Sequence, residues 1–372
     1  MNAPIRVPIS NVLLGNDYTG KMKVGAQQKE VNVLLDTGSS TLAVENRSYD
    51  PQKDHNAQVT DLIQEVGYAD GSSWIGSVVM TDVSVGAGVD LPNVAVAVAY
   101  HETAQMFGDA QGILGLAYAP LDDAVQLTRP TVPPTYTPNE VRAGHQTFVE
   151  PYFTELARSG LVANKYAFYT RRSVVHASAD PANDPLNNGV LILGGGEEAT
   201  DLYTGSFQSA LVLSDDWYSV NLRTVIVGNS APIPVPPPTH NSQVRTNAII
   251  DSGTNGLDLA PKLFDAILAQ FPAKLKKLMH ARQVTTNSIN FNEWPDITFV
   301  LQGDSGNEVK LVVKPENYWQ LDGFEAGNAV RGLWRGTDQQ SILGLPLMNG
   351  YFTIFDDGAN NGMGAVKFAA IR

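Results

Sequence analysis

Two aspartates in matching contexts are the residues of this chain best suited to do chemistry. Asp36 stands in VLLDTGSS (33–40) and Asp251 in AIIDSGTN (248–255), so each carboxylate follows an apolar run and precedes a hydroxyl residue and a glycine. Glycine lets the backbone approach closely where a buried strand turns. If the two loops meet, their carboxylates lie too close for both to ionise, and the pair shares one proton.

A carboxylic acid beside a carboxylate suits general acid–base hydrolysis. With a water between them, the ionised carboxylate takes a proton from the water as it attacks a peptide carbonyl, and the protonated partner donates toward the carbonyl oxygen. No covalent intermediate is required. Because coupled carboxyl groups titrate as a pair, the sequence leaves open which aspartate is the acid and which is the base.

The two motifs belong to an internal repeat. Each is followed downstream by a similar apolar segment, GILGL (112–116) in the first half and SILGL (341–345) in the second. One Asp-Ser/Thr-Gly tripeptide is ordinary turn chemistry, but the repeated order of motif and segment indicates a duplication. We therefore expect two lobes, residues 1–170 with the first aspartate and residues 171–372 with the second.

Short β-branched runs bounded by turn residues predict a mostly β protein. The predicted strands cover 31–36, 77–85, 93–100, 189–195, 218–228, 247–251 and 296–303. Two helices are expected. The first lies within 147–160, where Thr147 and Glu150 have the spacing of a capping box and Gly160 suits the C-terminal cap; the second begins at Pro261. The Pro-rich segments 128–138 and 231–240 are predicted to be surface loops outside any sheet.

Composition excludes several classes of protein. The 372 residues carry 38 acidic and 25 basic side chains, a net charge of −13 that disfavours nucleic acid and anionic membranes as partners. No cysteine is present, and the six histidines show no metal-binding spacing, so no cofactor or metal is expected. Without an apolar leader segment the chain is expected to be cytoplasmic, or secreted or periplasmic if a leader has been removed. We expect a monomer.

These motifs resemble those of the pepsin family of aspartic proteases over nearly the whole chain. DTGSS and DSGT resemble the two active-site loops of that family, and YADGSS (68–73) resembles its flap, a hairpin that closes over substrate. The resemblance implies an all-β, bilobal pepsin-like acid protease fold with two duplicated β-rich lobes and a few short helices. It also implies an aspartic endopeptidase that is most active in acid, is inhibited by pepstatin and prefers bulky hydrophobic residues around the cleaved bond.

The resemblance assigns a role to each matching residue. Asp36 and Asp251 would be catalytic, Ser39 and Thr254 would donate hydrogen bonds to their outer oxygens, and the loops would interlock through two further hydroxyls. Serine at position 252 keeps the hydroxyl that the family's threonine supplies. The residues expected to support the pair are Thr37, Gly38, Ser39, Ser252, Gly253 and Thr254. The residues expected to contact substrate from the flap are Tyr68, Asp70, Gly71 and Ser72.

Two positions depart from the family pattern. Ala43 stands where a tryptophan commonly donates a hydrogen bond to the flap tyrosine, and Trp74 on the flap itself is the candidate replacement. Leu345 stands where many members carry aspartate. Leu34, Phe107 and Ile113 either line an apolar pocket for the residue before the cleaved bond or belong to the ordinary core.

Two other functions remain open. The first is a catalytically silent pepsin-fold protein that binds peptides. The second is a glycosidase, which would need carboxylates about 5–9 Å apart and usually aromatic sugar platforms. GNDYTGKM (15–22) has the glycine spacing of a phosphate-binding loop, but Met22 replaces the hydroxyl residue that holds magnesium, so no nucleotide is expected.

Overall fold

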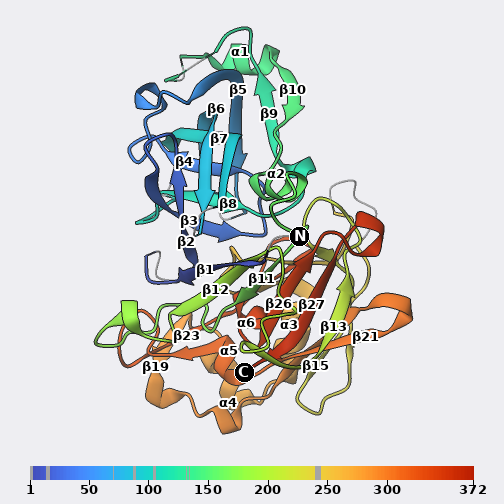
Figure 1. Cartoon of the computed structure of the whole chain (residues 1–372). Helices are drawn as coiled ribbons and strands as arrows, with labels where there is room; N and C mark the ends of the chain where they lie inside the picture. The colour runs from blue at the N-terminus through green and yellow to red at the C-terminus, as the bar shows by residue number, and fades with distance from the viewer. Residues whose placement is uncertain are drawn as a thin grey trace.

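The computed structural model describes residues 3–13, 17–69, 71–86, 89–103, 106–130, 132–133, 135–238 and 244–372. Strands dominate the described chain, and its helices are short. Figure 1 shows two β-rich bodies stacked one above the other, the upper formed by the first half of the chain and the lower mainly by the second. The predicted all-β, bilobal fold is confirmed, whereas the domain boundary at residues 170 and 171 stays a prediction.

The strands of the first half of the chain run from β1, near the N-terminus, to β11, which ends at Tyr169. They are β1 (Ile5–Ser10), β2 (Thr19–Val24), β3 (Lys29–Asp36), β4 (Leu42–Glu45), β5 (Gln58–Gly67), β6 (Ser73–Val85), β7 (Val89–Glu102), β8 (Gly112–Gly115), β9 (Asp123–Gln126), β10 (His145–Phe148) and β11 (Lys165–Tyr169).

The strands of the second half are mostly shorter. They are β12 (Asn188–Leu193), β13 (Tyr203–Leu211), β14 (Ser219–Val220), β15 (Leu222–Val227), β16 (Ile233–Pro234), β17 (Ala248–Ile250), β18 (Leu257–Leu259), β19 (Gln283–Thr285), β20 (Ile297–Gln302), β21 (Glu308–Val313), β22 (Trp319–Leu321), β23 (Asn328–Arg331), β24 (Leu333–Arg335), β25 (Ser341–Leu343), β26 (Tyr351–Asp356) and β27 (Ala365–Ile371). All seven predicted strand regions contain strands.

The helices of the described chain are short. They are α1 (Pro138–Ala143), α2 (Tyr152–Arg158), α3 (Pro261–Gln270), α4 (Ala273–Leu278), α5 (Pro315–Tyr318) and α6 (Leu345–Met348). The predicted helix start at Pro261 is confirmed, and Gly160 follows α2 with φ +77°, as its capping role requires.

Two local predictions are wrong. Thr147 and Glu150 form no capping box, because Thr147 lies in β10 opposite Ala124 and α2 starts later, with Pro151 at its N-cap. The segment 231–240 is not entirely outside the sheets, since β16 pairs with β15. Proline is tolerated there because β16 is the edge strand of its sheet.

One sheet connects both bodies. Its strand order is β10-β9-β5-β6-β7-β4-β8-β3-β2-β1-β12-β11-β26-β27-β13. The connection is made by β1, which pairs with β2 on one side and with β12 on the other. The second half adds a five-stranded sheet in the order β14-β17-β25-β18-β24, and this smaller sheet carries the second aspartate loop.

The sequence repeat corresponds to a repeated strand arrangement. In the first half β3, which ends at Asp36, pairs in parallel with β8, and β8 pairs antiparallel with β4. In the second half β17, which ends one residue before Asp251, pairs in parallel with β25, and β25 pairs antiparallel with β18. Both aspartates therefore sit at the same position of the same three-strand unit.

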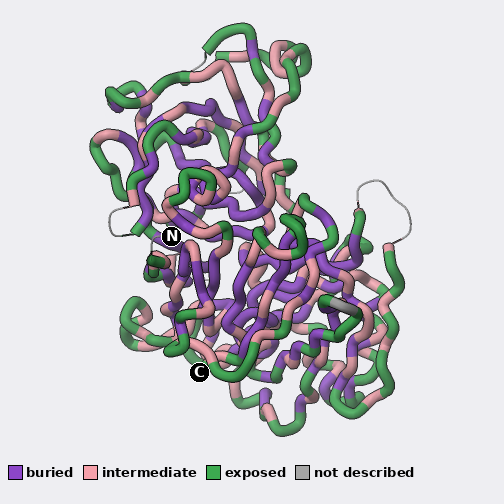
Figure 2. Tube along the Cα trace, turned by 45° about the vertical axis from the view of Figure 1, so that its right-hand side comes forward, coloured by how far each residue is buried: buried purple, intermediate pink, exposed green. Residues whose placement is uncertain are grey.

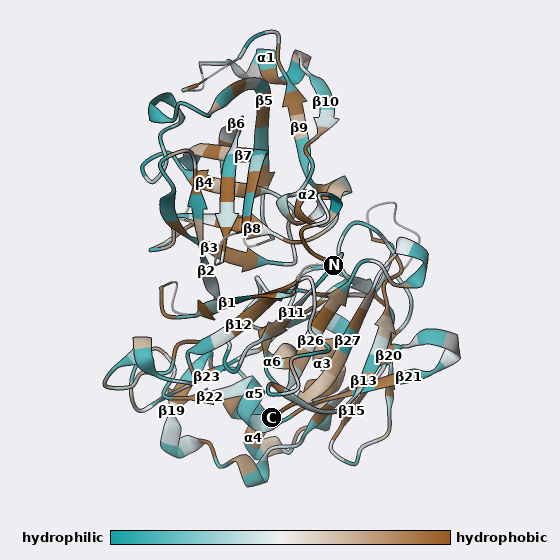
Figure 3. Cartoon of the chain, in the orientation of Figure 1, coloured by the Kyte–Doolittle hydropathy of each residue, from teal (hydrophilic) through white to brown (hydrophobic). Residues whose placement is uncertain are grey.

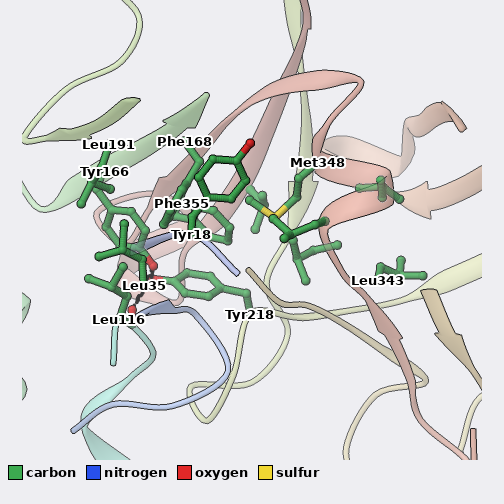
Figure 4. Close-up of a cluster of buried hydrophobic side chains, with 14 of the residues drawn as sticks. Tyr18, Leu35, Leu116, Tyr166, Phe168, Leu191, Tyr218, Leu343, Met348 and Phe355 are labelled. Carbon is green, nitrogen blue, oxygen red and sulfur yellow. Dashed lines mark hydrogen bonds between the residues drawn. The ribbon is translucent and has the colours of Figure 1, made fainter. Parts of the chain in front are cut away.

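The apolar core lies directly behind these loops. Figures 2 and 3 show buried and hydrophobic residues concentrated in the strands, with exposed and hydrophilic residues in the outer turns. Leu35 and Leu343, each from one of the repeated units, belong to one continuous buried cluster with Phe355 (Figure 4). Because protein interiors are close-packed, this shared core fixes the two loops relative to each other.

Candidate active site

The first aspartate loop holds its carboxylate with local donors. Asp36 is 5% exposed at the end of β3. Its Oδ1 accepts a hydrogen bond from the Gly38 amide at 2.7 Å, and its Oδ2 accepts one from the Ser39 hydroxyl at 2.5 Å. The tripeptide after the aspartate thus folds back and fixes the orientation of the carboxyl group.

The second loop repeats this arrangement. Asp251 is 7% exposed. Its Oδ1 accepts a hydrogen bond from the Gly253 amide at 2.8 Å, and its Oδ2 accepts one from the Thr254 hydroxyl at 2.7 Å. Leu345, which departs from the family pattern, is fully buried beside this loop and donates its amide to the Thr254 carbonyl at 2.8 Å.

Two hydroxyl side chains cross from one loop to the other. The Thr37 hydroxyl accepts the Ser252 amide at 2.9 Å and donates to the Ile250 carbonyl at 3.2 Å. Reciprocally, the Ser252 hydroxyl accepts the Thr37 amide at 3.0 Å and donates to the Leu35 carbonyl at 2.8 Å. These four buried bonds form a nearly two-fold symmetric lock between the halves of the chain.

The two glycines bring the carboxyl groups together. A Cβ atom at Gly253 would lie 2.3 Å from Asp36 Oδ1, and one at Gly38 would lie 2.8 Å from Asp251 Oδ1. The two carboxyl groups therefore lie close enough for each to affect the ionisation of the other. Burial, followed by the neighbouring charge of Asp251, raises the pKa of Asp36 well above its usual range. The arrangement therefore favours a pair that retains one proton.

The hairpin of β5 and β6 carries the residues predicted to contact substrate. Within its turn the Tyr68 amide donates to the Ser72 carbonyl at 2.9 Å, and Gly71 adopts a φ of +85°. Asp70 lies outside the described residues. The Tyr68 side chain is partly buried, and this burial, followed by the charge of Asp36, raises its pKa. Tyr68 thus lies in the electrostatic environment of the first aspartate.

Trp74 takes the place predicted for it. Its indole Nε1 donates a hydrogen bond to the Tyr68 hydroxyl at 3.0 Å, and the side chain is 1% exposed. Trp74 packs in one small apolar cluster with Ala43, Phe107 and Ile113. An alanine at position 43 leaves room for an indole that comes from the flap strand itself.

The three predicted pocket residues belong to that same cluster. Phe107 and Ile113 are 2% and 0% exposed, and Leu34 is partly buried against them together with Tyr68. They therefore pack in the same cluster as the flap residues Tyr68 and Trp74. Whether they line a substrate pocket stays a prediction.

Comparison with known proteins agrees with this geometry. The family model for eukaryotic aspartyl protease matches residues 17–370. This chain belongs to the eukaryotic aspartyl protease family. It is 26% identical over 381 residues to a protein named Beta-secretase from Strongylocentrotus purpuratus and 23% identical over 377 residues to Pepsin A from Sus scrofa. These matches cover 92% and 97% of the chain. The chain spans 65% of the length of the first relative and 84% of the second.

Membership of the eukaryotic aspartyl protease family confirms the predicted resemblance. It also supports the prediction of an aspartic-type endopeptidase, because both aspartate loops lie inside the matched range. The match extends over both halves of the chain, so it covers the duplicated units as well as the segments between them.

Sequence reasoning missed a polar network behind the loops of this family member. The Leu116 amide donates to the Asp36 carbonyl at 2.7 Å, and the Leu116 carbonyl accepts the Tyr166 hydroxyl at 2.9 Å. The Tyr166 hydroxyl also lies 2.8 Å from the Tyr218 hydroxyl, which in turn lies 2.9 Å from an Asp357 carboxyl oxygen. Figure 4 shows Tyr166 and Tyr218 reaching toward Leu116. No sequence motif marks this network, since its members lie far apart in the chain.

The missed residues include a second indole. Trp217 Nε1 donates to the Gly38 carbonyl at 3.0 Å, so a residue of the second half contacts the first aspartate loop.

Within the described ranges no group of three or more His, Cys, Asp or Glu side chains could hold a metal ion. Over those same ranges, no helix has both the length and the apolar character needed to cross a membrane.

Proposed function

We propose that this protein is an aspartic endopeptidase whose catalytic pair is Asp36 and Asp251. The observation that carries the proposal is the contact of each carboxylate with the glycine of the opposite loop, which brings two buried carboxyl groups close together. Such a pair is suited to share one proton and to act as acid and base in one step.

The mechanism uses one water and no covalent intermediate. The ionised carboxylate takes a proton from water as the water oxygen bonds to the peptide carbonyl carbon. The protonated carboxyl donates its proton to the carbonyl oxygen, which gives a neutral tetrahedral diol. A proton then passes from the pair to the amide nitrogen, the carbon–nitrogen bond breaks, and a hydroxyl proton returns to the pair.

The residues around the pair have supporting roles in this proposal. The Gly38 and Gly253 amides with the Ser39 and Thr254 hydroxyls orient the carboxylates. The lock formed by Thr37 and Ser252 sets the distance between them.

The substrate is an extended peptide held beneath the flap. Tyr68, Gly71 and Ser72 would contact its backbone, much as an added strand pairs with a hairpin. The apolar cluster of Leu34, Phe107 and Ile113 favours bulky hydrophobic residues around the cleaved bond. The protein would act as a monomer on peptide or protein substrates.

Activity should be highest in acid. The mechanism needs one proton on the pair, and burial favours the protonated form of Asp36. Activity is therefore lost as the pH rises and the pair gives up that proton. Pepstatin carries a hydroxyl that stands in for the attacking water, so it should bind the pair and inhibit cleavage.

The test is cleavage of denatured haemoglobin from pH 3 to pH 7, with and without pepstatin. We expect acid-favoured cleavage that pepstatin abolishes and that falls by at least about 1,000-fold in both Asp36→Asn and Asp251→Asn. A folded wild-type protein that cleaves nothing at any pH would overturn the proposal and favour a silent peptide-binding protein. Retained activity in either variant would rule out the shared pair.

A further inference from the structure

Three segments of the first half meet at the buried side chain of Asp122. The carboxylate Oδ1 accepts a hydrogen bond from the Thr41 hydroxyl at 2.6 Å and another from Gln64 Nε2 at 2.6 Å. Gln64 also donates to the Asp123 carbonyl at 3.1 Å. Thr41 lies five residues after Asp36, and Gln64 lies on the flap strand β5, four residues before Tyr68. One carboxyl group therefore joins the first aspartate loop to the flap.

The surroundings of Asp122 are unusual for a purely structural carboxylate. It is 1% exposed, and the charged groups that act on it are two other acids, Asp123, which is the first residue of β9, and Glu150, which follows β10. Asp122 in turn acts on Tyr68 at the flap tip. Burial raises the pKa of Asp122 to about 6, although Thr41 and Gln64 oppose that rise. An asparagine at position 122 could accept similar hydrogen bonds without the cost of burying an ionisable carboxyl group.

The strand that follows Asp122 extends the contact with the flap. β9 pairs with β5 through Gln126 opposite Leu62, and the Leu127 amide donates to the Asp61 carbonyl at 2.8 Å. β10 then covers the outer edge of β9. The flap strand is thus held on its outer side along the stretch that ends at Gln64, and the hairpin beyond Gln64 projects from this fixed base.

Resting on the proposed function, we propose that Asp122 is a positioning residue that holds the flap in register with the first aspartate loop. Its Oδ1 accepts hydrogen bonds from both the Thr41 hydroxyl and the Gln64 side-chain amide. Hydrogen bonds to an ionised acceptor are roughly twice as strong as those between neutral groups. The flap is therefore held more firmly once Asp122 ionises.

Two substitutions separate the hydrogen bonds from the charge. Asp122→Ala removes the acceptor, so the Thr41 and Gln64 side chains lose their common partner. Asp122→Asn keeps an acceptor oxygen but stays neutral at every pH. Asp123→Asn is the matched control, because Asp123 is exposed and contacts Gln64 only through its backbone carbonyl.

The first measurement is amide hydrogen exchange of the full-length protein, which is independent of catalysis. In Asp122→Ala the amides of β5 and the flap turn should exchange about tenfold faster, with the strands of the second half unchanged. Asp123→Asn should match the wild type. Equal acceleration throughout the chain would show a general loss of stability and overturn the positioning role, as would unchanged flap exchange.

The second measurement is the dissociation constant of pepstatin at pH 4 and pH 7, taken as the ratio of Asp122→Asn to wild type at each pH. The ratio should be close to one at pH 4, where both side chains are neutral, and should rise to about fivefold at pH 7. A ratio that does not change with pH would overturn the role of the charge. A wild type that never binds pepstatin would refute the proposed function instead, and hydrogen exchange would still decide whether Asp122 holds the flap.

Discussion

The two aspartate loops make the same hydrogen bonds to their own carboxylates and to each other, but different residues surround them. Each carboxylate accepts one amide and one hydroxyl from the next three residues, and each loop contributes one hydroxyl to the lock between them. Around the first loop lie the flap strands and Asp122. Around the second loop the Trp334 ring packs against Gly256. The shared interior suits the chemistry, whereas the different surroundings suit control of the substrate.

This division explains how much the two halves could diverge. The inner contacts are made by backbone groups, glycines and small hydroxyls that leave little room for change. The outer contacts use large side chains that can come from different strands. For example, Trp74 donates a hydrogen bond to Tyr68 from the flap, and position 43 beside it is an alanine. Substitutions should therefore have large, matched effects inside the loops and smaller, unmatched effects outside them.

The largest effects are expected from the two glycines that touch the opposite carboxylates. Gly38→Ala and Gly253→Ala would each push a carboxyl group aside, because their Cβ atoms would lie 2.8 and 2.3 Å from its oxygen. We expect kcat/KM to fall by about 100-fold or more in both, with the greater loss in Gly253→Ala. Peptide cleavage assays and circular dichroism would measure activity and folding.

Gly358→Ala is the control for this pair, since the nearest atom to its Cβ would be 3.5 Å away. It should retain full activity. If Gly253→Ala were as active as the wild type, the close contact between the loops would not be needed for catalysis, and the comparison of the two loops would lose its basis.

The network behind the loops should give the next largest effect. Burial, followed by the charge of Asp356, raises the pKa of Asp357 to about 7, so the folded protein favours its protonated form. The resulting contribution to stability is present below about pH 4 and is lost as the pH rises through about 7. The unfolding free energy of Asp357→Asn minus that of the wild type should therefore rise by about 2 kcal/mol from pH 5 to pH 8.

Urea unfolding at several pH values would measure this change. Asp215→Asn, which removes an exposed carboxylate of the same half, controls for the loss of one negative charge. An equal pH dependence in Asp357→Asn and wild type would show that Asp357 does not couple protonation to the junction between the two halves.

The sequence predicted the interior of the site because its determinants are local. The hydroxyls and glycines that hold each carboxylate lie within three residues of it, and the repeat marks both loops. β3 alternates apolar and polar residues before its apolar end, and β17 is a continuous apolar run. Both strands are therefore recognisable in the sequence. The lock between the loops followed from family resemblance and the matching residues.

The outer parts of the site could not be predicted, because their partners are distant in sequence. Asp122 and Gln64 are separated by 58 positions, and Trp217 and Gly38 by 179. Neither pair lies in a motif. Thr147 was misassigned for a related reason: its spacing to Glu150 suits a helix start, but pairing with β9 places it in a strand. Tertiary pairing decided between two locally acceptable structures.

The lock between the loops allows a sharper test of symmetry. Thr37→Val and Ser252→Ala each remove a hydroxyl that both accepts an amide and donates to a carbonyl. Each should lower the unfolding free energy by about 1–3 kcal/mol, because buried backbone groups lose their partners. In the double variant the losses should not add, since the two hydroxyls act on the same pair of loops. Full additivity in urea unfolding would contradict a single cooperative lock.

The smallest effect is expected outside the loops, at Trp74. Trp74→Phe keeps an aromatic ring in the cluster but removes the Nε1 donor to the Tyr68 hydroxyl. One neutral hydrogen bond is worth about 1 kcal/mol, so KM for a peptide substrate should rise about three- to tenfold while kcat changes little. Trp334→Phe removes an indole bond to the Arg331 carbonyl in the second half and should leave KM closer to wild type. If Trp334→Phe raised KM more than Trp74→Phe did, the surroundings of the second loop would govern substrate binding, and the division between the two halves would have to be reversed.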